Sequence, residues 1–420
     1  MILRIDGQAI PVYENEICRY GIYSAPNGEK KSAAVEILTE QTVSGAVSVK
    51  PMKQNIQVRR EGEQISLLAP IPAKLSVEFE DSNVKPLFLF LYEAETEIPT
   101  GENVRRFEAG EHHVGLLELH SGDVLYLAEG AILRGTLKAF DGENITVCGR
   151  GIIDADVVGD KVRRMLDFRR LKNVTIRDVT LTGSFSWCTV LTASENVKVD
   201  GVNIMTWRCT GDGIDIVGSN NVLVQNCFIR ANDDCVAIKA VDYFDPDGMR
   251  NVHDVTVRSS VMWNAHFGNG IEIGFETRCD EIYNVIFEDL DIIHCEHEGW
   301  QSGGTLTIHN GDRARVHHII YRDIRIEDSY DKLFDFKVMH SRYSRDEVRG
   351  SVDNILVERV EVVAGHIPPS ILSGFTPDDH LVTNVRFVDV RFKGEIIDNM
   401  IDCRMVAERT KEISFERSGV

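Results

Sequence analysis

A short pattern of polar and apolar residues recurs along most of the chain. A polar residue and then Asn precede a strand of alternating aliphatic residues, as in Lys172-Asn173-Val174-Thr175-Ile176. Two further copies have Asp or His in place of the Asn. The Asn position recurs every 23 to 36 residues, at Asn144, Asn173, Asn196, Asn221, Asp254, Asn284, His318, Asn354 and Asn384. A repeat of this length with a loose period is typical of a solenoid, in which insertions fall between strands.

A second series of short strands runs in phase with the first. It includes Gly213-Ile214-Asp215-Ile216, Cys235-Val236-Ala237-Ile238 and Gly270-Ile271-Glu272-Ile273. Connections between the strands lack the long stretches of 3.6-residue periodicity that helices of an α/β fold would need. We therefore expect an all-β fold, a right-handed parallel β-helix whose like positions stack about 4.8 Å apart. The recurring Asn predicts a ladder of turns, in which each side chain bonds the backbone of its neighbours.

Residues 1–97 follow a different pattern from the rest of the chain. Alternating segments such as Ala73-Lys74-Leu75-Ser76-Val77-Glu78-Phe79 predict a small N-terminal β-sandwich domain. A segment from Glu97 to Asn103, which contains Pro99 and Gly101, is suited to a linker. We therefore expect a β-sandwich over residues 1–97 and a β-helix catalytic domain over residues 98–420.

Composition and charge narrow the choice of partner and compartment. The net charge of −20 repels nucleic acid and anionic membranes, and no apolar run reaches membrane-spanning length. Nine cysteines are scattered without a CxxC pair, which argues for reduced thiols. The segment Met1–Gly7 alternates like a strand and lacks the regions of a signal peptide. We expect a cytoplasmic protein with no nucleic-acid or membrane partner, and the sequence leaves its oligomeric state open.

Three aspartates stand where two neighbouring strands of the second series begin. Asp212 precedes Asp234 by 22 residues, about one coil of the solenoid, and Asp233 adjoins Asp234. Crowded carboxylates raise the pKa of at least one member, which yields a proton donor beside ionised neighbours. Glycoside hydrolysis needs this division between an acid and a base. A single Asp at a strand end usually caps a turn, but three in register favour a catalytic site.

The residues around these aspartates resemble glycoside hydrolase family 28, the polygalacturonase-like family, over about residues 105–400. The most specific blocks are Asp212-Gly213-Ile214-Asp215 and Asp233-Asp234-Cys235-Val236-Ala237-Ile238-Lys239, and Gly122–Ala131 resembles the first coil of bacterial members. The resemblance implies an inverting hydrolase with Asp233 as general acid, and with Asp212 and Asp234 activating water. It implies no metal or cofactor, and a pectin-type or rhamnogalacturonan-type oligosaccharide as substrate.

Two blocks of that family are absent. This chain has Gly268-Asn269-Gly270 where the family has Gly-His-Gly, and Thr307-Ile308-His309 where it has Arg-Ile-Lys. In the family, the missing side chains help to bind the galacturonate carboxylate. The resemblance therefore supports the acids and weakens an assignment to polygalacturonate, whereas rhamnogalacturonan remains compatible.

Strand register predicts two columns of side chains on the outward face of the second series. One column holds Lys239, His309 and Lys337, and the other holds Asp215, Glu272, Thr307 and Asp335. Trp300 lies in an insertion that would rise beside the acids, whereas we expect Trp187 to fill the core. The candidate substrate-binding residues are Asp215, Lys239, Asn269, Glu272, His309, Lys337 and Trp300.

Three other functions stay open from the sequence. A glycosidase on neutral glucans, resembling family 49, also joins a β-sandwich to a β-helix and uses clustered Asp residues. A β-helix lyase or epimerase would need calcium-binding carboxylates and a basic residue at the site of proton abstraction. A non-catalytic carbohydrate-binding β-helix would retain binding without turnover.

Overall fold

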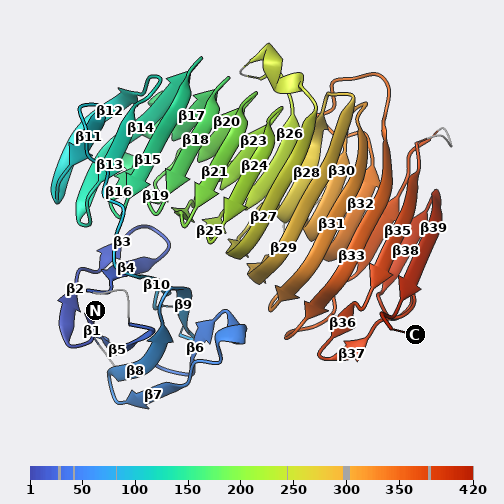
Figure 1. Cartoon of the computed structure of the whole chain (residues 1–420). Helices are drawn as coiled ribbons and strands as arrows, with labels where there is room; N and C mark the ends of the chain where they lie inside the picture. Colours follow the sequence, from blue (N-terminus) through green and yellow to red (C-terminus); the bar gives the residue numbers. More distant parts are fainter. Residues whose placement is uncertain are drawn as a thin grey trace. The chain divides into compact units, whose positions relative to one another are not determined.

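The chain forms two compact units in a computed structural model, Met1–Thr100 and Gly101–Val420 (Figure 1). The structure describes residues 1–26, 30–40, 43–81, 83–243, 245–296, 303–376 and 380–419. The division after Thr100 falls three residues beyond the boundary expected from the sequence, within the segment that contains Pro99 and Gly101. Among the described residues, no helix has both the length and the apolar character needed to span a bilayer.

The N-terminal unit contains two five-stranded sheets that share one core. One sheet has the order β2-β1-β5-β8-β7, and the other has the order β3-β4-β10-β9-β6. The strands are β1 (Ile2–Ile5), β2 (Gln8–Ile10), β3 (Tyr13–Glu14), β4 (Arg19–Ser24), β5 (Ser32–Leu38), β6 (Val47–Lys50), β7 (Val58–Glu61), β8 (Gln64–Pro70), β9 (Ala73–Phe79) and β10 (Leu87–Tyr92), and the 3-10 helix η1 is Met52–Gln54. Ile37 of one sheet and Leu75 of the other belong to the same buried cluster. The pairing is antiparallel except between β4 and β10, which run parallel.

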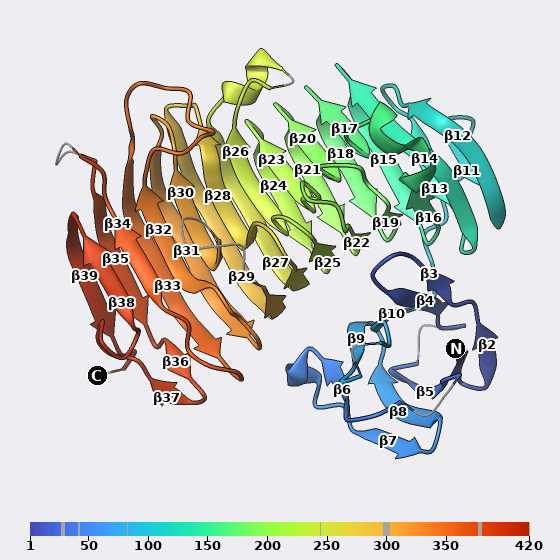
Figure 2. The same ribbon diagram turned by 180° about the vertical axis from the view of Figure 1, so that it is seen from behind.

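The second unit is a parallel β-helix in which three sheets wind around one apolar core (Figures 1 and 2). The first sheet, which carries the Asn repeat, contains β11 (Val104–Phe107), β13 (Val124–Leu127), β15 (Glu143–Gly149), β18 (Lys172–Arg177), β21 (Glu195–Asp200), β24 (Asn220–Gln225), β35 (Val382–Val388) and β39 (Thr410–Glu416). The second contains β12 (Gly110–Glu118), β16 (Ile152–Asp154), β19 (Thr180–Thr182), β22 (Asn203–Met205), β25 (Phe228–Ala231), β36 (Arg391–Phe392) and β37 (Glu395–Ile396). Four long strands, β27 (Val252–Asn264), β29 (Glu281–Cys295), β31 (Arg315–Ile326) and β33 (Ser351–Val362), contribute to both.

The third sheet corresponds to the second series of strands in the sequence. It contains β17 (Leu166–Arg169), β20 (Thr189–Thr192), β23 (Ile214–Val217), β26 (Val236–Ala240), β28 (Asn269–Thr277), β30 (Gly304–Asn310), β32 (Lys332–Val338), β34 (Ser370–Ser373) and β38 (Met405–Glu408), and it begins on β14 (Ala131–Phe140). Alternate residues of each strand point into the core, such as Ile214, Ile216, Val236 and Ile238. The predicted right-handed parallel β-helix is confirmed.

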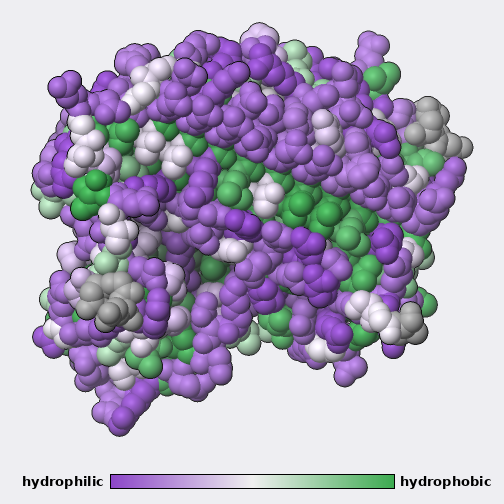
Figure 3. All heavy atoms as spheres, viewed as in Figure 1, coloured by the Kyte–Doolittle hydropathy of each residue, from purple (hydrophilic) through white to green (hydrophobic). Residues whose placement is uncertain are grey.

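The third sheet is covered on its outward face as well as on its core face. In β18 of the first sheet the outward residues are exposed or half-buried, whereas every residue of β23, β26 and β30 is buried. Long connections leave the sheet after β26, where the 3-10 helix η3 (Pro246–Met249) lies, and after β32 over residues 339–350. Both rise from the same edge of the solenoid (Figure 1). Most of the surface seen in Figure 3 is hydrophilic.

The repeated Asn position is a left-handed turn. All nine residues of the repeat have φ between 51° and 57°, a region that Asn, Asp and His tolerate better than other side chains do. The ladder bonds differ from the expectation, because they join side chain to side chain. Asn173 Nδ2 donates to Asn144 Oδ1 at 3.0 Å, and Asn196 Nδ2 donates to Asn173 Oδ1 at 3.1 Å. These bonds tie neighbouring coils together at the same corner.

Candidate active site

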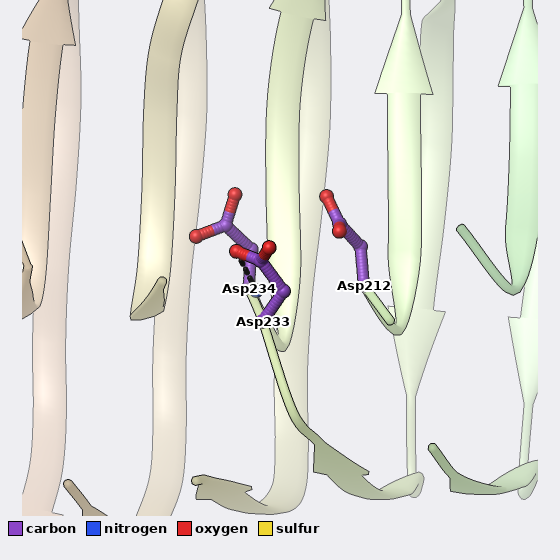
Figure 4. A group of neighbouring side chains, drawn as sticks. All are labelled: Asp212, Asp233 and Asp234. Atoms are coloured by element: carbon purple, nitrogen blue, oxygen red, sulfur yellow. Dashed lines mark hydrogen bonds between the residues drawn. The ribbon is translucent and has the colours of Figure 1, made fainter. Parts of the chain in front are cut away.

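Three carboxylates meet where two neighbouring strands of the third sheet begin. Asp212 precedes β23 and Asp233 and Asp234 precede β26, and these strands pair with Ile214 opposite Val236. One oxygen of each carboxylate lies within 4.8 Å of the other two (Figure 4). Asp212 is 1% exposed and Asp234 is 6% exposed, whereas Asp233 is half-buried. The one-coil spacing thus brings together the three aspartates that the sequence singled out.

The turn before β28 holds Asp233 and Asp234 in place. Asn264 Nδ2 donates to the carbonyl oxygen of Asp233 at 2.8 Å, and Asp233 Oδ1 accepts from the amide of Asp234 at 3.1 Å. Gly268 has φ of 67°, and a Cβ atom there would clash with Asp233 Oδ1 and the amide of Asp234. Only glycine therefore allows this close approach of the two turns.

Lys239 supplies the positive charge of the cluster. Its ammonium lies 2.8 Å from Asp212 Oδ2, 3.2 Å from Asp215 Oδ1 and 3.6 Å from Asp234 Oδ2. Burial alone would lower the pKa of Lys239, but the nearby Asp212, Asp215 and Asp234 raise it well above its usual value. This lysine is a fixed cation, and it does not exchange protons near neutral pH.

Two carboxyls of the cluster hold a proton more tightly than an ordinary aspartate. Burial, opposed by Lys239, raises the pKa of Asp234 well above its usual value, and the charges of Asp212 and Glu272 add to this effect. Burial and the charge of Asp212 likewise raise the pKa of Asp215. The cluster can therefore carry protonated and ionised carboxyls side by side, as acid–base chemistry requires.

Two buried oxygens of the site have no hydrogen-bond partner among the described residues. Asn269 Nδ2 donates to Asp234 Oδ1 at 2.7 Å, but Asn269 Oδ1 is buried without a hydrogen-bond partner among the described residues. Asp212 Oδ1 is likewise buried without a hydrogen-bond partner among the described residues. A water molecule or a substrate hydroxyl would satisfy both oxygens. The spacing of the three aspartates also suits a cation, but Lys239 already provides a counter-charge and we assign no metal.

A second charged group lies farther along the third sheet. His309 Nδ1 lies 2.9 Å from Glu272 Oε2, and its Nε2 lies 2.9 Å from Asp335 Oδ2. Glu272 also accepts from the hydroxyl of Thr307. Lys337 Nζ pairs with Asp335 Oδ1 at 2.8 Å. Glu272, His309 and Asp335 are fully buried, so three adjacent coils are joined by charges out of reach of solvent.

The predicted column of Asp215, Glu272, Thr307 and Asp335 is present in the strand register, whereas a register shift after Ile238 separates Lys239 from the column of His309 and Lys337. Neither column forms an open cleft floor. Glu272 lies opposite Ala237 and Thr307, and His309 lies opposite Gly274 and Lys337. The expectation that His309 faces an acidic sugar is wrong, because it is buried and both ring nitrogens already bind carboxylates. Asp215 and Glu272 are buried too, whereas Lys337 is partly exposed. Trp300 lies outside the described residues.

Sequence reasoning missed aromatic contacts around the charged groups. Phe275 stacks on His309 with ring centroids 4.7 Å apart, and Tyr343 of the connection 339–350 packs on Phe275 at 5.6 Å. Trp187 does not fill the core as expected. It packs against the outward Val190 and Val217, and Lys239 Nζ lies 4.2 Å from its ring centroid. The position of Trp187 one residue before the buried Cys188 was the available signal for an outward side chain.

The sequence comparisons point to one family. Residues 147–340 match the family model described as glycosyl hydrolases family 28, which confirms the resemblance seen in the blocks around Asp212 and Asp233. A polygalacturonase of Chamaecyparis obtusa is 38% identical over 164 residues, which cover 39% of this chain and 29% of the relative. An endo-polygalacturonase of Pectobacterium carotovorum subsp. carotovorum is 31% identical over 137 residues and covers 30% of each chain. The chain therefore spans less than a third of the length of these relatives.

Solved structures share the fold at low sequence identity. A hyperthermoactive exopolygalacturonase from Thermotoga maritima has a TM-score of 0.57 and 17% identity, covering 69% of this chain and 79% of that one. A family 28 exopolygalacturonase from Yersinia enterocolitica has a TM-score of 0.56 and 13% identity, covering 94% of this chain and 95% of that one. At these identities the likeness shows the fold alone.

Proposed function

We propose that this chain, whose middle part matches glycosyl hydrolases family 28, is an inverting glycoside hydrolase acting on a pectin-type oligosaccharide. Asp233 is the proposed general acid, and Asp212 and Asp234 are proposed to activate the attacking water. The relatives named polygalacturonase support the reaction class, although the chain spans only part of their length.

The observation that carries the proposal is the meeting of three carboxylates around one buried lysine. Cleavage of a glycosidic bond needs one carboxylic acid to protonate the leaving oxygen and one carboxylate to activate water. Lys239 lies nearest to Asp212, so the proposed base has a buried counter-charge beside it. Asp233 is the least buried of the three, so it is best placed to reach the leaving oxygen of a bound sugar.

The test of this assignment uses reducing-end release from rhamnogalacturonan, polygalacturonate and neutral glucan oligosaccharides. Asp233→Asn is expected to lower kcat on the oligosaccharide that is cleaved by a factor of about 10² to 10⁴, the usual contribution of general acid catalysis. On an activated aryl glycoside of the same sugar, which needs no acid, the variant should retain most activity. Asp234 has the raised pKa, so the same loss and rescue in Asp234→Asn but not in Asp233→Asn would transfer the acid role to Asp234.

The stereochemical outcome needs its own measurement. The nearest oxygens of the three aspartates lie within 4.8 Å of one another, whereas the carboxyl groups of inverting enzymes are commonly about 6.5–9.5 Å apart. Inversion therefore rests on the resemblance to family 28. Proton NMR of the first product formed would show the inverted anomer, and the retained anomer would instead make one of the buried aspartates a nucleophile.

A neutral sugar next to the acids fits the charge of the site better than galacturonate does. Lys239 is bound to three aspartates, and His309 lies between two carboxylates. A uronate carboxylate would meet a mainly acidic surface there, which Coulomb repulsion disfavours. We therefore favour a rhamnogalacturonan-type substrate over polygalacturonate. An unsaturated product absorbing in the ultraviolet would instead identify a lyase.

Cytoplasmic location stays a proposal. All nine cysteines are free thiols, and eight of them are buried, which suits a reducing compartment. Fractionation of the native host would test this location, and protein in the culture medium would contradict it.

A further inference from the structure

The buried group of Glu272, His309 and Asp335 has a fixed charge pattern. A neutral imidazole donates from one nitrogen only, but here each ring nitrogen lies 2.9 Å from a carboxylate oxygen. Donation from both ring nitrogens to two carboxylates requires an imidazolium. Burial alone would lower the pKa of His309, but Glu272 and Asp335 raise it to about 9. The imidazolium thus persists across the neutral pH range.

This group reaches the proposed catalytic acids through β28. Glu272 lies three residues after Asn269 on that strand, and Asn269 donates to Asp234 Oδ1 at 2.7 Å. β28 pairs directly with β26, which Asp234 precedes. The negative charge of Glu272 is among the causes that raise the pKa of Asp234. A change in the charge of Glu272 therefore changes the pKa of Asp234.

We propose that His309 is a positioning residue, whose imidazolium fixes the place and the charge of Glu272 next to the proposed catalytic acids. It touches neither substrate nor the reacting atoms, because it is fully buried and Phe275 stacks on its ring. The part of this inference that concerns activity rests on the proposed function.

Several charged groups surround Asp234 and His309, and Asp215 and Glu276 act on the neighbouring Lys239. Lys239 and Asp212 act on Asp234 together with Glu272, and Asp233 adjoins it. On the other side, Asp335 is paired with Lys337 at 2.8 Å and with Lys332 at 3.7 Å. The hydroxyls of Thr307 and Tyr321 are the uncharged titratable or donor groups nearby, the first bonded to Glu272 and the second to the carbonyl of Thr307. Among the described residues, His309 is the cation that forms an ion pair with Glu272.

The experiment replaces Glu272 by Gln, which keeps the shape and removes the charge. The carboxyl of Asp234 is followed by carbon NMR of protein labelled at aspartate carboxyls, with Asp234→Asn to assign the signal. Glu272→Gln is expected to lower the titration midpoint of Asp234, because a negative neighbour is lost. His309→Gln, which leaves Glu272 without its cation, is expected to move the titration midpoint of Asp234. An unchanged Asp234 curve in folded His309→Gln would overturn the proposal.

The pH dependence of kcat/KM provides a second, independent test. If Asp234 acts as a base, the acid limb of the kcat/KM profile should move to lower pH in Glu272→Gln. Asp353→Asn, on the first sheet, is the control and should leave the limb in place. A moved NMR titration without hydrolysis of any substrate would keep the role of His309 and reject the proposed function. Hydrolysis of a substrate with no change in the acid limb or in the Asp234 titration would keep the proposed function and reject the role of His309.

Discussion

The ammonium of Lys239 lies 2.8 Å from Asp212 Oδ2 and joins two neighbouring coils of the solenoid at the proposed active site. It also lies above the ring of Trp187. A lysine that is 5% exposed and bound to three aspartates is a structural cation as well as a tuning charge.

Removing this cation should damage both stability and activity. Lys239→Met keeps the length of the side chain and leaves the buried aspartates without a counter-charge. Breaking a buried ion pair from one side costs about 3–5 kcal/mol, so the free energy of unfolding in urea should fall by about that amount. Activity should fall at least tenfold at neutral pH, because Asp234 loses the cation that lowers its pKa and holds its proton more tightly. Lys198→Met, which removes an exposed pair with Asp200, should cost no more than about 1 kcal/mol.

Gly268 should be indispensable to the position of Asp233. In Gly268→Ala, the new Cβ atom clashes with Asp233 Oδ1 and must push the aspartate away. We expect kcat to fall at least tenfold with a smaller change in KM, since the general acid is displaced. Gly122→Ala is the matched control, because Gly122 has a positive φ of 82° but open space around its Cβ position. Equal loss of activity in both variants would mean that backbone strain alone is responsible.

The ladder of asparagines should contribute to stability through both conformation and hydrogen bonds. Asn196→Ala loses the bonds to Asn173 and Asn221 and places Ala at φ of 57°. The strained conformation costs roughly 1–2 kcal/mol, and each hydrogen bond contributes about 1 kcal/mol. Asn196→Gly should restore the first contribution and not the second. Chemical denaturation of the three proteins checks this order, and a glycine variant no better than the alanine variant would contradict it.

The His309 imidazolium predicts a loss of stability at alkaline pH. Its folded pKa of about 9 lies above the usual value of 6.5, so its stabilising effect is complete below about pH 6.5 and is lost as the pH rises through 9. The difference in unfolding free energy between the wild type and His309→Gln should therefore be large at pH 6 and shrink by pH 10. Thermal unfolding across this range measures it. A constant difference would show that the imidazole is already neutral in the folded protein.

The fold and the clustering of the three aspartates could be predicted because both follow from sequence spacing. Asn173 and Asn196 recur at one-coil distance, and the same distance separates Asp212 from Asp234. Like positions of a parallel solenoid stack by necessity, so register follows from the repeat. The correction of the ladder bonds shows the limit, because the spacing does not say whether Asn196 bonds a backbone or a side chain.

The surroundings of His309 could not be predicted in the same way. Register correctly placed it in one column with Lys337, but exposure depends on what covers the outward face of the sheet. Phe275 and Tyr343 contribute to that cover from the end of β28 and from a long connection, and neither follows the repeat. Trp187 was misplaced for a related reason, since a large apolar side chain suits a covered outward face as well as a core.

The proposed catalytic acids and the long connections stand at opposite edges of the third sheet. Asp212, Asp233 and Asp234 come before its strands, whereas the connections after β26 and β32 come behind them. Insertions and deletions in those two connections can therefore accumulate without shifting the aspartates. Exchange of either connection is therefore expected to leave the three aspartates in place.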